Sequence, residues 1–307
     1  LGGGLAGMSA ACHLLDAGHP VTLVEKRPFL GGRAFSFFHP FRGQDGPEAS
    51  TSESVHSADG DETARLPETQ EGVPGFPVDN GQHVFLGCCN YYIDYLRAIG
   101  ALDKTYIQSS LRTEVMLDGK TGVLSSTPAL GRLHLLPSFI RYPHLGLVDK
   151  LLVVYGLLRV KLIKRSKIAP ALDNETAYSW LKRHGQTDRA IDNLWNLFIL
   201  PSLNDDVRSA SADMALMVFQ EALLKRPKDA AIGLSRVGLT SLNGEPAQRA
   251  IEARGGKVIL GKAVRSMRYK DGRVCAVELS DGRVHQADAY VSALPYDVLL
   301  QVLPDEV

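Results

Sequence analysis

The first 24 residues carry a hydrophobic pattern that changes from helical to extended spacing. Apolar side chains recur at the three- or four-residue spacing of one helix face, at Leu5, Met8, Cys12 and Leu15. Gly18 follows at the position of a left-handed residue that ends a helix. Residues 21–24 form a short apolar run that predicts a buried strand. We therefore expect a glycine loop, a helix and a strand, which make up most of one βαβ unit.

Helical spacing dominates the middle of the chain. A helix is expected after residue 83, with Gly100 as its stop and with four inward positions, Tyr92, Tyr95, Leu96 and Ile99. Residues 111–124 are typical of a hairpin whose turn is Asp118-Gly119. Residues 130–230 are expected to be mostly helical.

The apolar segment at residues 145–163 also contains charges, namely Asp149, Lys150, Arg159 and Lys161. A helix that spans a bilayer needs roughly 20 mostly apolar residues without such charges, so a spanning helix is excluded. Two interpretations remain. The segment is a helix of a substrate domain, or residues 145–167 form an interfacial helix on a membrane surface. In the second case a basic cluster would lie near anionic head groups: Lys161, Lys164, Arg165 and Lys167.

Two further helices are predicted from capping residues and apolar stripes. Asp188 is expected to cap a helix with an inward face of Ile191, Leu194, Trp195 and Phe198. Ser211 is expected to cap a helix with an inward face of Met214, Met217 and Val218. Stripes of this kind usually belong to a core, and the alternative is that some of these residues line an apolar substrate tunnel.

The last part of the chain alternates from helix to strands. A helix with Pro246 in its first turn is expected to run to Arg254 and to end at Gly255-Gly256. Strands are expected at 257–260, 264–269, 273–279, 283–287 and 289–293. Asp271-Gly272 and Asp281-Gly282 are suited to the hairpin turns between three of them.

Residues 41–75 differ from the rest of the chain in composition. They contain eight carboxylates and two arginines and are rich in Ser, Thr, Gly and Pro. Such a segment has little apolar surface to bury, so we expect an inserted, solvated and flexible loop.

Composition and charge exclude several classes of protein. The 307 residues include 34 basic and 34 acidic side chains, so the net charge is zero, and nucleic-acid binding through phosphates is not expected. The four cysteines form no C-x-x-C motif, which argues against a zinc site or a disulfide framework; they are Cys12, Cys88, Cys89 and Cys275. A reducing compartment fits best, and no metal is expected. Leu1 stands immediately before the glycines, which indicates a fragment without its first strand.

The glycines at the start form the motif G-x-G-x-x-G. Gly2 permits a tight turn, Gly4 lets the backbone approach a pyrophosphate, and Gly7 lets the helix pack closely. The helix N-terminus presents unpaired N–H groups to phosphates. Glu25 ends the next strand, 21 residues after Gly4, close to the distance of about 20 residues expected for an acid that binds ribose hydroxyls. The segment predicts a dinucleotide site.

A second glycine pair follows Glu25 in the run Lys26 to Arg33. Gly31 and Gly32 indicate another close approach of the backbone to a ligand, and Arg33 has a planar guanidinium that can donate to phosphate.

At this point the sequence resembles a known superfamily. G-G-G-L-A-G-M-S-A-A followed by E-K-R-P-F-L-G-G-R is similar to the flavin-containing amine oxidase and phytoene desaturase superfamily. The resemblance implies that FAD is bound, that Glu25 holds the adenosine ribose, and that the backbone near Val264 meets the adenine. The residues expected to bind FAD are Gly2, Gly4, Leu5, Ala6, Gly7, Glu25, Lys26, Gly31, Gly32, Arg33 and Val264.

Three more segments suggest a narrower relationship: residues 78–83 (V-D-N-G-Q-H), 196–212 and 234–242. Together they resemble the hydroxysqualene dehydroxylases, also called squalene-associated FAD-dependent desaturases, of hopanoid biosynthesis. This resemblance implies reduction of a hydroxylated C30 polyprenoid to squalene, with loss of water. It also implies a further C-terminal part that this chain does not contain.

The resemblance leads to an expected fold and location. We expect an α/β protein with a Rossmann-like FAD-binding domain, made of a parallel sheet and a β-meander in residues 1–85 and 236–307. A mostly helical substrate domain, residues 86–235, is expected as an insertion. The expected location is cytoplasmic, and the interfacial-helix alternative for residues 145–167 would add peripheral contact on the inner face of the cytoplasmic membrane.

His83 is the candidate catalytic acid. It stands in a polar cluster with Asp79, Asn80 and Gln82, and histidine titrates near neutral pH. The alternative is that these residues only hydrogen-bond a turn near the flavin.

Three other functions share this fold. A carotenoid or phytoene desaturase removes hydride from an apolar polyene, and a flavin amine oxidase acts on a cationic amine. A prenyl-binding protein such as a Rab GDP-dissociation inhibitor has no redox chemistry. The intact set of Gly2, Gly4, Gly7 and Glu25 argues against the last of these.

Overall fold

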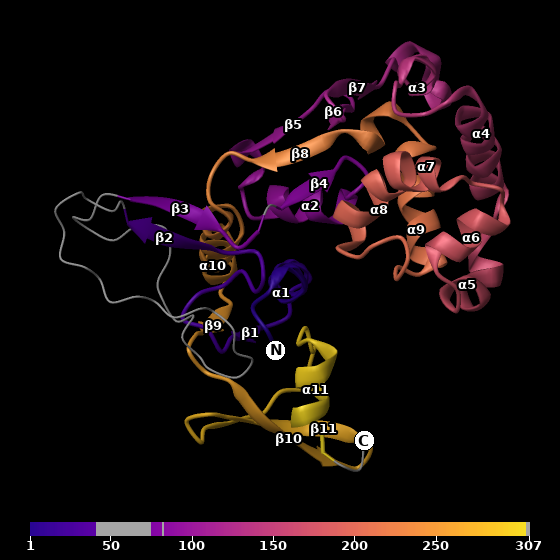
Figure 1. Ribbon diagram of the computed structural model, residues 1–307. Helices are drawn as coiled ribbons and strands as arrows, with labels where there is room; N and C mark the ends of the chain where they lie inside the picture. Colours follow the sequence, from indigo (N-terminus) through magenta and orange to yellow (C-terminus); the bar gives the residue numbers. More distant parts are fainter. Residues whose placement is uncertain (41–74, 82, 305–307) are drawn as a thin grey trace, which may run out of the picture. The chain divides into compact units, whose positions relative to one another are not determined.

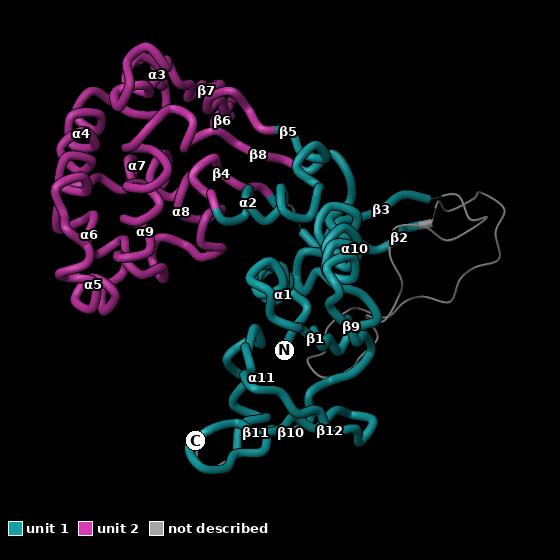
Figure 2. The backbone as a smooth tube through the Cα atoms, turned by 180° about the vertical axis from the view of Figure 1, so that it is seen from behind, with its two compact units in different colours: residues 1–83, 91–106, 235–307 teal, residues 84–90, 107–234 magenta. Residues whose placement is uncertain are grey.

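The computed structural model describes residues 1–40, 75–81 and 83–304. The chain divides into two compact units (Figures 1 and 2). Unit 1 comprises Leu1–His83, Tyr91–Tyr106 and Ser235–Val307, and unit 2 comprises Val84–Asn90 and Ile107–Leu234. The predicted acidic loop falls almost entirely outside the described residues.

Unit 1 contains the expected helix and strand near its start. α1 (Leu5–Asp16) is followed by Gly18 at φ 85°, and β1 (Thr22–Val24) comes next. β1 pairs in parallel with β9 (Lys257–Ile259), which follows α10 (Glu245–Ala253). These elements confirm the predicted order of glycine loop, helix and strand, and they confirm a mixed α/β fold. The parallel sheet has two strands in the described residues.

A three-stranded antiparallel meander completes the late part of unit 1. It consists of β10 (Val264–Lys270), β11 (Arg273–Leu279) and β12 (Val284–His285). Asp271 and Gly272 both have positive φ, 52° and 78°, as the tight hairpin turn requires. The meander shares a small core with α11 (Tyr296–Val302), in which Met267, Val277, Leu279 and Val302 are buried.

The predicted strand at residues 289–293 is not formed. Two backbone hydrogen bonds connect this segment to Leu1: the Leu1 amino group donates to the Val291 carbonyl at 2.8 Å, and the Ala293 amide donates to the Leu1 carbonyl at 2.8 Å. Contacts with a single residue do not make a ladder of hydrogen bonds, so the segment is not a strand.

Residues 91–106 lie in unit 1, whereas the sequence placed them with the helical domain. The helix expected after residue 83 is α2 (Asn90–Ala98). Its Tyr95 hydroxyl donates to the Asn243 carbonyl at 3.1 Å, and the Arg254 guanidinium donates to the Ala98 carbonyl at 3.0 Å. These contacts with a distant part of the sequence draw α2 into unit 1. The other elements of unit 1 are β2 (Ser36–Pro40), β3 (Gly75–Asp79), η1 (Leu102–Lys104) and η6 (Thr240–Gly244).

Unit 2 is mostly helical, as expected. Its strands are β4 (Val84–Leu86), β6 (Arg112–Leu117), β7 (Lys120–Ser125) and β8 (Ile232–Ser235). β5 (Thr105–Ile107) comes directly before Gln108, whose backbone amide donates to the Ile232 carbonyl at 2.9 Å. The predicted Asp118-Gly119 turn joins β6 and β7 with φ of 50° and 71°. The helices are η2 (Pro128–Leu133), α3 (Leu136–Arg141), α4 (Leu147–Leu162), α5 (Arg165–Asp173), α6 (Ala177–Arg183), α7 (Asp188–Ala190), η3 (Ile191–Trp195), α8 (Asn196–Leu203), α9 (Ala212–Val218), η4 (Phe219–Leu223) and η5 (Pro227–Ala230).

Large aromatic side chains fill the core of unit 2. Trp195 is fully buried, its ring centroid lies 4.6 Å from that of Phe219, and its indole N–H donates to the Gln186 side chain at 2.9 Å. Gly156 of α4 faces Trp195 and Gln186, because a Cβ on Gly156 would lie 2.9 Å from both the Trp195 ring and the Gln186 side-chain amide. α4 therefore packs on the core through its glycine.

Two details of the predicted helices in unit 2 are wrong. The residue that caps α7 is Thr187, whose hydroxyl accepts from the Ala190 amide at 3.1 Å, while Asp188 is the first helical residue. Ser211 does cap α9 and Val218 is buried as predicted, but Met214 is exposed, and Ala215 and Leu216 are buried. The buried positions of α9 therefore include only part of the predicted stripe.

Candidate functional site

The glycine turn before α1 is packed so closely that it has no room for side chains. The Gly2 amide donates to the Val24 carbonyl at 2.9 Å, and Gly2 has φ 95°. A Cβ on Gly7 would lie 1.9 Å from the Gly2 carbonyl oxygen. The turn and the first turn of α1 therefore require glycine at both positions for steric reasons.

Gly4, by contrast, faces open space. Gly4 has φ −77° and ψ 179°, a backbone conformation that any residue can adopt. A Cβ on Gly4 would approach only the Gly32 Cα, at 3.8 Å. No side chain caps α1 at Gly4, and the first N–H groups of a helix have no partner within the helix. The Leu5, Ala6 and Gly7 amides thus belong to a positive, uncapped helix end.

The second glycine pair lies directly against this turn. Gly4 and Gly31 form a parallel bridge, and the Gly31 amide donates to the Gly3 carbonyl at 2.9 Å. Gly31 and Gly32 have φ of 133° and 59°. A Cβ on Gly32 would lie 2.8 Å from the Gly4 Cα. The structure thus brings together both predicted glycine segments as a single backbone surface.

Glu25 points into the glycine turn. One carboxylate oxygen, Oε2, accepts from the Gly3 amide at 2.5 Å, and Oε1 accepts from the Arg27 amide at 2.9 Å. The side chain is only 7% exposed. Each carboxylate oxygen has a second lone pair, so Glu25 keeps capacity to accept hydrogen bonds from a ligand hydroxyl beside the turn.

Arg27 is a contributor to this region that no motif in the sequence indicated. Its guanidinium donates to the Gly32 carbonyl at 2.8 Å and lies over the Phe35 ring, 4.8 Å from the centroid. It therefore holds the second glycine pair in place. Lys26 and Arg33, which the sequence did indicate, have exposed side chains, and the Arg33 carbonyl accepts from the Asn80 amide group at 3.0 Å.

Val264 begins β10, where it pairs with Leu279. Two residues before it, the Lys262 amide donates to the Glu25 carbonyl at 3.0 Å. The backbone before Val264 is therefore hydrogen-bonded to Glu25, at the end of β1. The predicted contact of Val264 with the adenine requires this proximity to Glu25.

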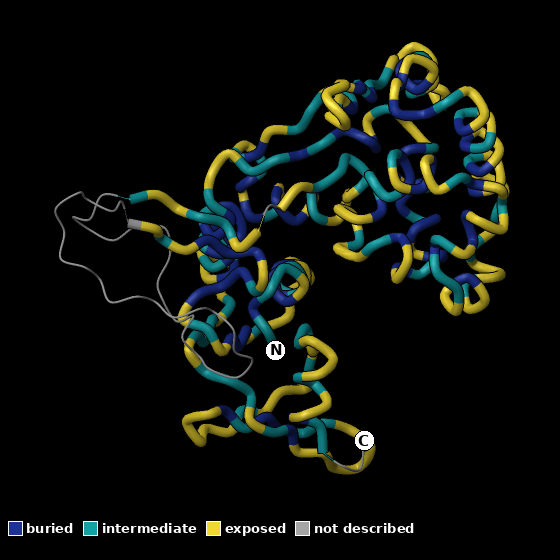
Figure 3. The backbone as a smooth tube through the Cα atoms, viewed as in Figure 1, coloured by how far each residue is buried: buried dark blue, intermediate teal, exposed yellow. Residues whose placement is uncertain are grey.

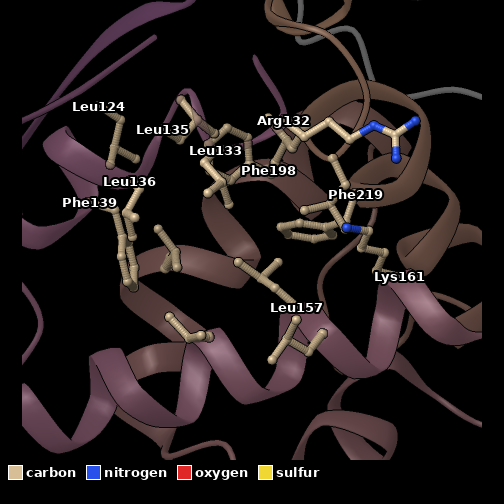
Figure 4. Close-up of a pocket in the computed structure, with 15 residues that line it drawn as sticks. Leu124, Arg132, Leu133, Leu135, Leu136, Phe139, Leu157, Lys161, Phe198 and Phe219 are labelled. Carbon is tan, nitrogen blue, oxygen red and sulfur yellow. The ribbon is translucent and has the colours of Figure 1, made fainter. Parts of the chain in front are cut away.

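Unit 2 contains an apolar pocket of about 180 Å³ (Figure 4). Thirteen of its lining residues are leucine, valine or phenylalanine, and two are basic: Leu124, Leu133, Leu135, Leu136, Phe139, Val154, Leu157, Leu158, Leu194, Phe198, Phe219, Leu223 and Leu224, with Arg132 and Lys161. Leu194 and Phe198 belong to the apolar stripe for which the sequence offered a tunnel as an alternative to core. A cavity with this lining favours an apolar ligand.

A protein-family model for flavin-containing amine oxidoreductases matches residues 5–307. The chain belongs to this family.

Curated relatives of this family member include carotenoid enzymes. It is 26% identical to a zeta-carotene desaturase of Zea mays, over 100% of this chain and 50% of the relative. It is 24% identical to a 15-cis-phytoene desaturase of Glycine max, over 99% of this chain and 48% of the relative. The chain thus spans about half the length of these relatives.

Solved structures show the same fold. A putrescine oxidase with bound putrescine superposes with a TM-score of 0.63 at 18% identity, covering 98% of this chain and 58% of the oxidase. The PF1083 protein of Pyrococcus furiosus superposes with a TM-score of 0.60 at 17% identity, covering 99% of this chain and 60% of that protein. The likeness confirms the mixed α/β fold of the flavin-containing amine oxidoreductases.

The residues present in this family member fit the nucleotide part of a flavin. The open side of Gly4 and the uncapped helix end suit a pyrophosphate. The Glu25 carboxylate suits hydroxyl donors. A site of this composition has the donors and the acceptor that the two halves of the nucleotide require.

The described contact of His83 is with the turn that precedes it. The His83 side chain is exposed, and its Nδ1 lies 3.1 Å from the Gly81 carbonyl. The Asp79 carboxylate instead accepts from the Ser36 hydroxyl at 2.7 Å and from the Leu239 amide at 3.0 Å. Gln82 lies outside the described residues. Asp79 therefore ties β3 to a distant segment, and its partners were not predictable from spacing.

A different histidine, His134, is buried beside the pocket of unit 2. Its Nδ1 lies 2.7 Å from the Ser126 hydroxyl, and its Nε2 lies 3.1 Å from the Leu223 carbonyl. The neutral ring satisfies both contacts when Ser126 donates to Nδ1 and Nε2–H donates to Leu223. Burial lowers the pKa of His134 below its ordinary value of 6.5.

The buried His134 predicts that unit 2 loses stability in mild acid. The folded state prefers the neutral ring, so its stabilisation is complete above the unfolded pKa and is lost as the pH falls below it, at a slope of up to about 1.4 kcal/mol per pH unit. We expect the free energy of unfolding in urea to decrease between pH 7.5 and 5, and His134→Phe to make that decrease shallower. Replacing the exposed His19 by Gln is the matched control. An unchanged slope for His134→Phe would contradict the assignment.

Proposed function

We propose that the complete protein is an FAD-dependent oxidoreductase that acts on an apolar polyprenoid. The observation that carries the proposal is the Glu25 carboxylate, which accepts from the Gly3 amide beside the open face of Gly4. Bound flavin supplies hydride transfer, and the protein supplies binding, orientation and an environment.

The nucleotide-holding roles follow from the contacts in unit 1. The Leu5, Ala6 and Gly7 amides would donate to the pyrophosphate from the end of α1. Glu25 would accept from the ribose hydroxyls, and its negative charge would disfavour a phosphate on the ribose. Gly31 and Gly32, held by Arg27, would let the backbone approach the cofactor. Lys26 and Arg33 would supply positive charge at the surface.

The pocket in unit 2 supports an apolar substrate. Thirteen of its fifteen lining residues are leucine, valine or phenylalanine, and the other two, Arg132 and Lys161, are cations, so the lining offers no partner for a cationic amine. We therefore assign substrate binding to unit 2, which contains the pocket, and flavin binding to unit 1.

Carotenoid desaturation is the reaction that the relatives favour. The zeta-carotene and phytoene desaturases match the chain over almost its full length. In a desaturation, two hydrogens leave an apolar chain, one as hydride and one as a proton. A substrate of this kind needs an apolar site with no charge near the reacting carbons.

Reductive dehydroxylation of hydroxysqualene to squalene is the second candidate. It is favoured by the three segments at residues 78–83, 196–212 and 234–242, which resemble the hydroxysqualene dehydroxylases. In this reaction a hydride replaces a hydroxyl, and the leaving oxygen needs a proton. His83 is the residue that we propose as its donor, because it is exposed and therefore accessible to a bound substrate.

One experiment on the complete protein tests the proposal and separates the two reactions. Purified protein is expected to show the visible absorption of bound flavin. Oxidised protein incubated without oxygen with phytoene or zeta-carotene should form a desaturated product, or chemically reduced protein incubated with hydroxysqualene should form squalene. Protein without flavin absorption would exclude the oxidoreductase and favour a prenyl-binding protein. A flavoprotein that turns over only amines would exclude the polyprenoid substrate.

A further inference from the structure

One face of unit 2, formed by η2, α3 and α4, exposes an unusual number of large apolar side chains. Eleven such side chains between residues 130 and 162 are exposed. Figure 3 colours the backbone of exposed residues yellow. Four of the eleven lie on η2 and α3: Leu130, Leu133, Leu136 and Ile140. Seven lie on α4: Leu147, Val148, Leu151, Val154, Tyr155, Leu158 and Leu162. We call these residues the apolar face. Contiguous exposed apolar surface marks an interaction site.

The apolar face is not needed to pack α4 on its own unit. At about 100° per residue, Leu147, Leu151 and Leu158 fall on one side of the helix. Val153, Gly156 and Val160 fall on the opposite side and are buried. α4 is therefore apolar on both sides, and only one of them meets the core of unit 2.

Positive charge surrounds the apolar face. Residues 128–168 contain eight Lys or Arg and a single acid, Asp149. Asp149 is buried, and its carboxylate accepts from the Gly146 amide at 2.9 Å and from the Thr187 hydroxyl at 2.6 Å. Six of the basic side chains are exposed: Arg132, Arg141, Arg159, Lys161, Lys164 and Lys167. This segment thus presents cations and no exposed carboxylate of its own.

The pocket opens through the apolar face. Its lining includes exposed members of the face, Leu133, Leu136, Val154 and Leu158, and the exposed cations Arg132 and Lys161. Its inner wall is formed by buried residues such as Phe139 and Phe219. Arg132 and Lys161 project from η2 and α4 beside the apolar lining in Figure 4. An apolar ligand that enters the pocket must therefore cross this face.

We propose that the apolar face docks on the surface of an anionic lipid bilayer. The apolar side chains would enter the boundary of the acyl chains, and the surrounding cations would meet the lipid phosphates. A second copy of the chain fits the same surface less well, because a two-fold contact would bring the cations of both copies together. Docking itself does not depend on flavin; delivery of an apolar substrate from the bilayer into the pocket rests on the proposed function.

Vesicle binding by the complete protein tests this proposal. We expect the protein to sediment with vesicles of phosphatidylcholine and phosphatidylglycerol at least about tenfold more strongly than with phosphatidylcholine alone, and salt should weaken the difference. The double variant Leu147→Glu/Leu151→Glu should bind anionic vesicles about tenfold more weakly or worse. Arg159→Glu/Lys161→Glu should lose only the preference for anionic lipid.

The matched control is Met116→Glu. Met116 is as exposed as Leu147, at 77% against 76%, and lies on β6 outside the apolar face, so this variant should bind vesicles like the parent protein. Equal vesicle binding by Leu147→Glu/Leu151→Glu and Met116→Glu would overturn the proposal. A dimer in light scattering that the same double variant dissociates would also overturn it. Flavin absorbance should be equal in all variants, so failure of docking is distinguishable from failure of the flavin site.

Discussion

Gly7→Ala is expected to destabilise unit 1 by about 3 kcal/mol or more and to abolish flavin retention. The new Cβ would lie 1.9 Å from the Gly2 carbonyl oxygen, and a clash with backbone cannot be relieved by a rotamer change. Overpacking of a tight core typically costs about 1–3 kcal/mol, and this contact is shorter than most. Each lost kcal/mol lowers the Tm by about 2–4 °C in a domain of the size of unit 1. Thermal unfolding of the complete protein and the flavin absorbance after purification measure both effects.

Gly4→Ala is the matched substitution in the same motif. Its Cβ would approach the Gly32 Cα at an ordinary 3.8 Å, and its backbone conformation suits alanine. The flavin-free protein should therefore keep its Tm, while the dissociation constant of FAD should rise at least about tenfold, or 1.4 kcal/mol, because the methyl group occupies the open side of the turn. Parental FAD affinity in Gly4→Ala would mean that no ligand approaches that side.

Glu25→Gln is expected to weaken FAD binding by about two orders of magnitude. The two carboxylate oxygens accept from the Gly3 and Arg27 amides, and a glutamine must turn its NH₂ group toward one of these donors. Hydrogen bonds to a charged group contribute about 1.5–3 kcal/mol each, and one donor is left buried and unpaired. Titration of the flavin-free protein with FAD, followed by flavin fluorescence, gives the dissociation constant.

Glu278→Gln is the control for Glu25→Gln, because it removes the same charge from unit 1. Glu278 pairs with Arg268 at 3.4 Å on the exposed side of the meander, where an ion pair contributes about 0–1 kcal/mol. Its FAD affinity and Tm should match those of the parent protein. Similar behaviour of the two variants would show that the position of Glu25 in the turn has no special role.

Features determined by neighbouring residues were predictable from the sequence. The order of glycine turn, α1 and β1, the Asp118-Gly119 and Asp271-Gly272 turns, and the cap of α9 all depend on residues within a few positions of one another. Their conformations follow from the φ angles that glycine and aspartate tolerate and from the hydrogen bonds of a capping hydroxyl. The position of Glu25 beside the turn follows from the order of α1 and β1, because Glu25 comes directly after Val24, whose carbonyl accepts from the Gly2 amide.

Features determined by distant contacts were not predictable. Thr187 and Asp188 are both capping residues, and only the extended backbone of Thr187, with φ −76° and ψ 155°, decides between them. The assignment of α2 to unit 1 depends on Asn243 and Arg254, more than 140 positions later. The periodicity of apolar residues shows which positions share a side of a helix, but it does not show which side faces the core. For this reason the sequence predicts an inward Met214, which the structure leaves exposed. Arg27 contacts its carbonyl partner only because the glycine pair turns back toward it.

The hydrogen bonds that join Gly3 to Glu25 and to Gly31 all lie within the first 33 residues. β9, the sheet partner of β1, begins only at Lys257, and the whole of unit 2 is translated in between. Contacts that are close in sequence form fast, and those between remote segments form late. During synthesis the contacts of the glycine turn can therefore form early, whereas β9, the sheet partner of β1, emerges only after unit 2 has been translated.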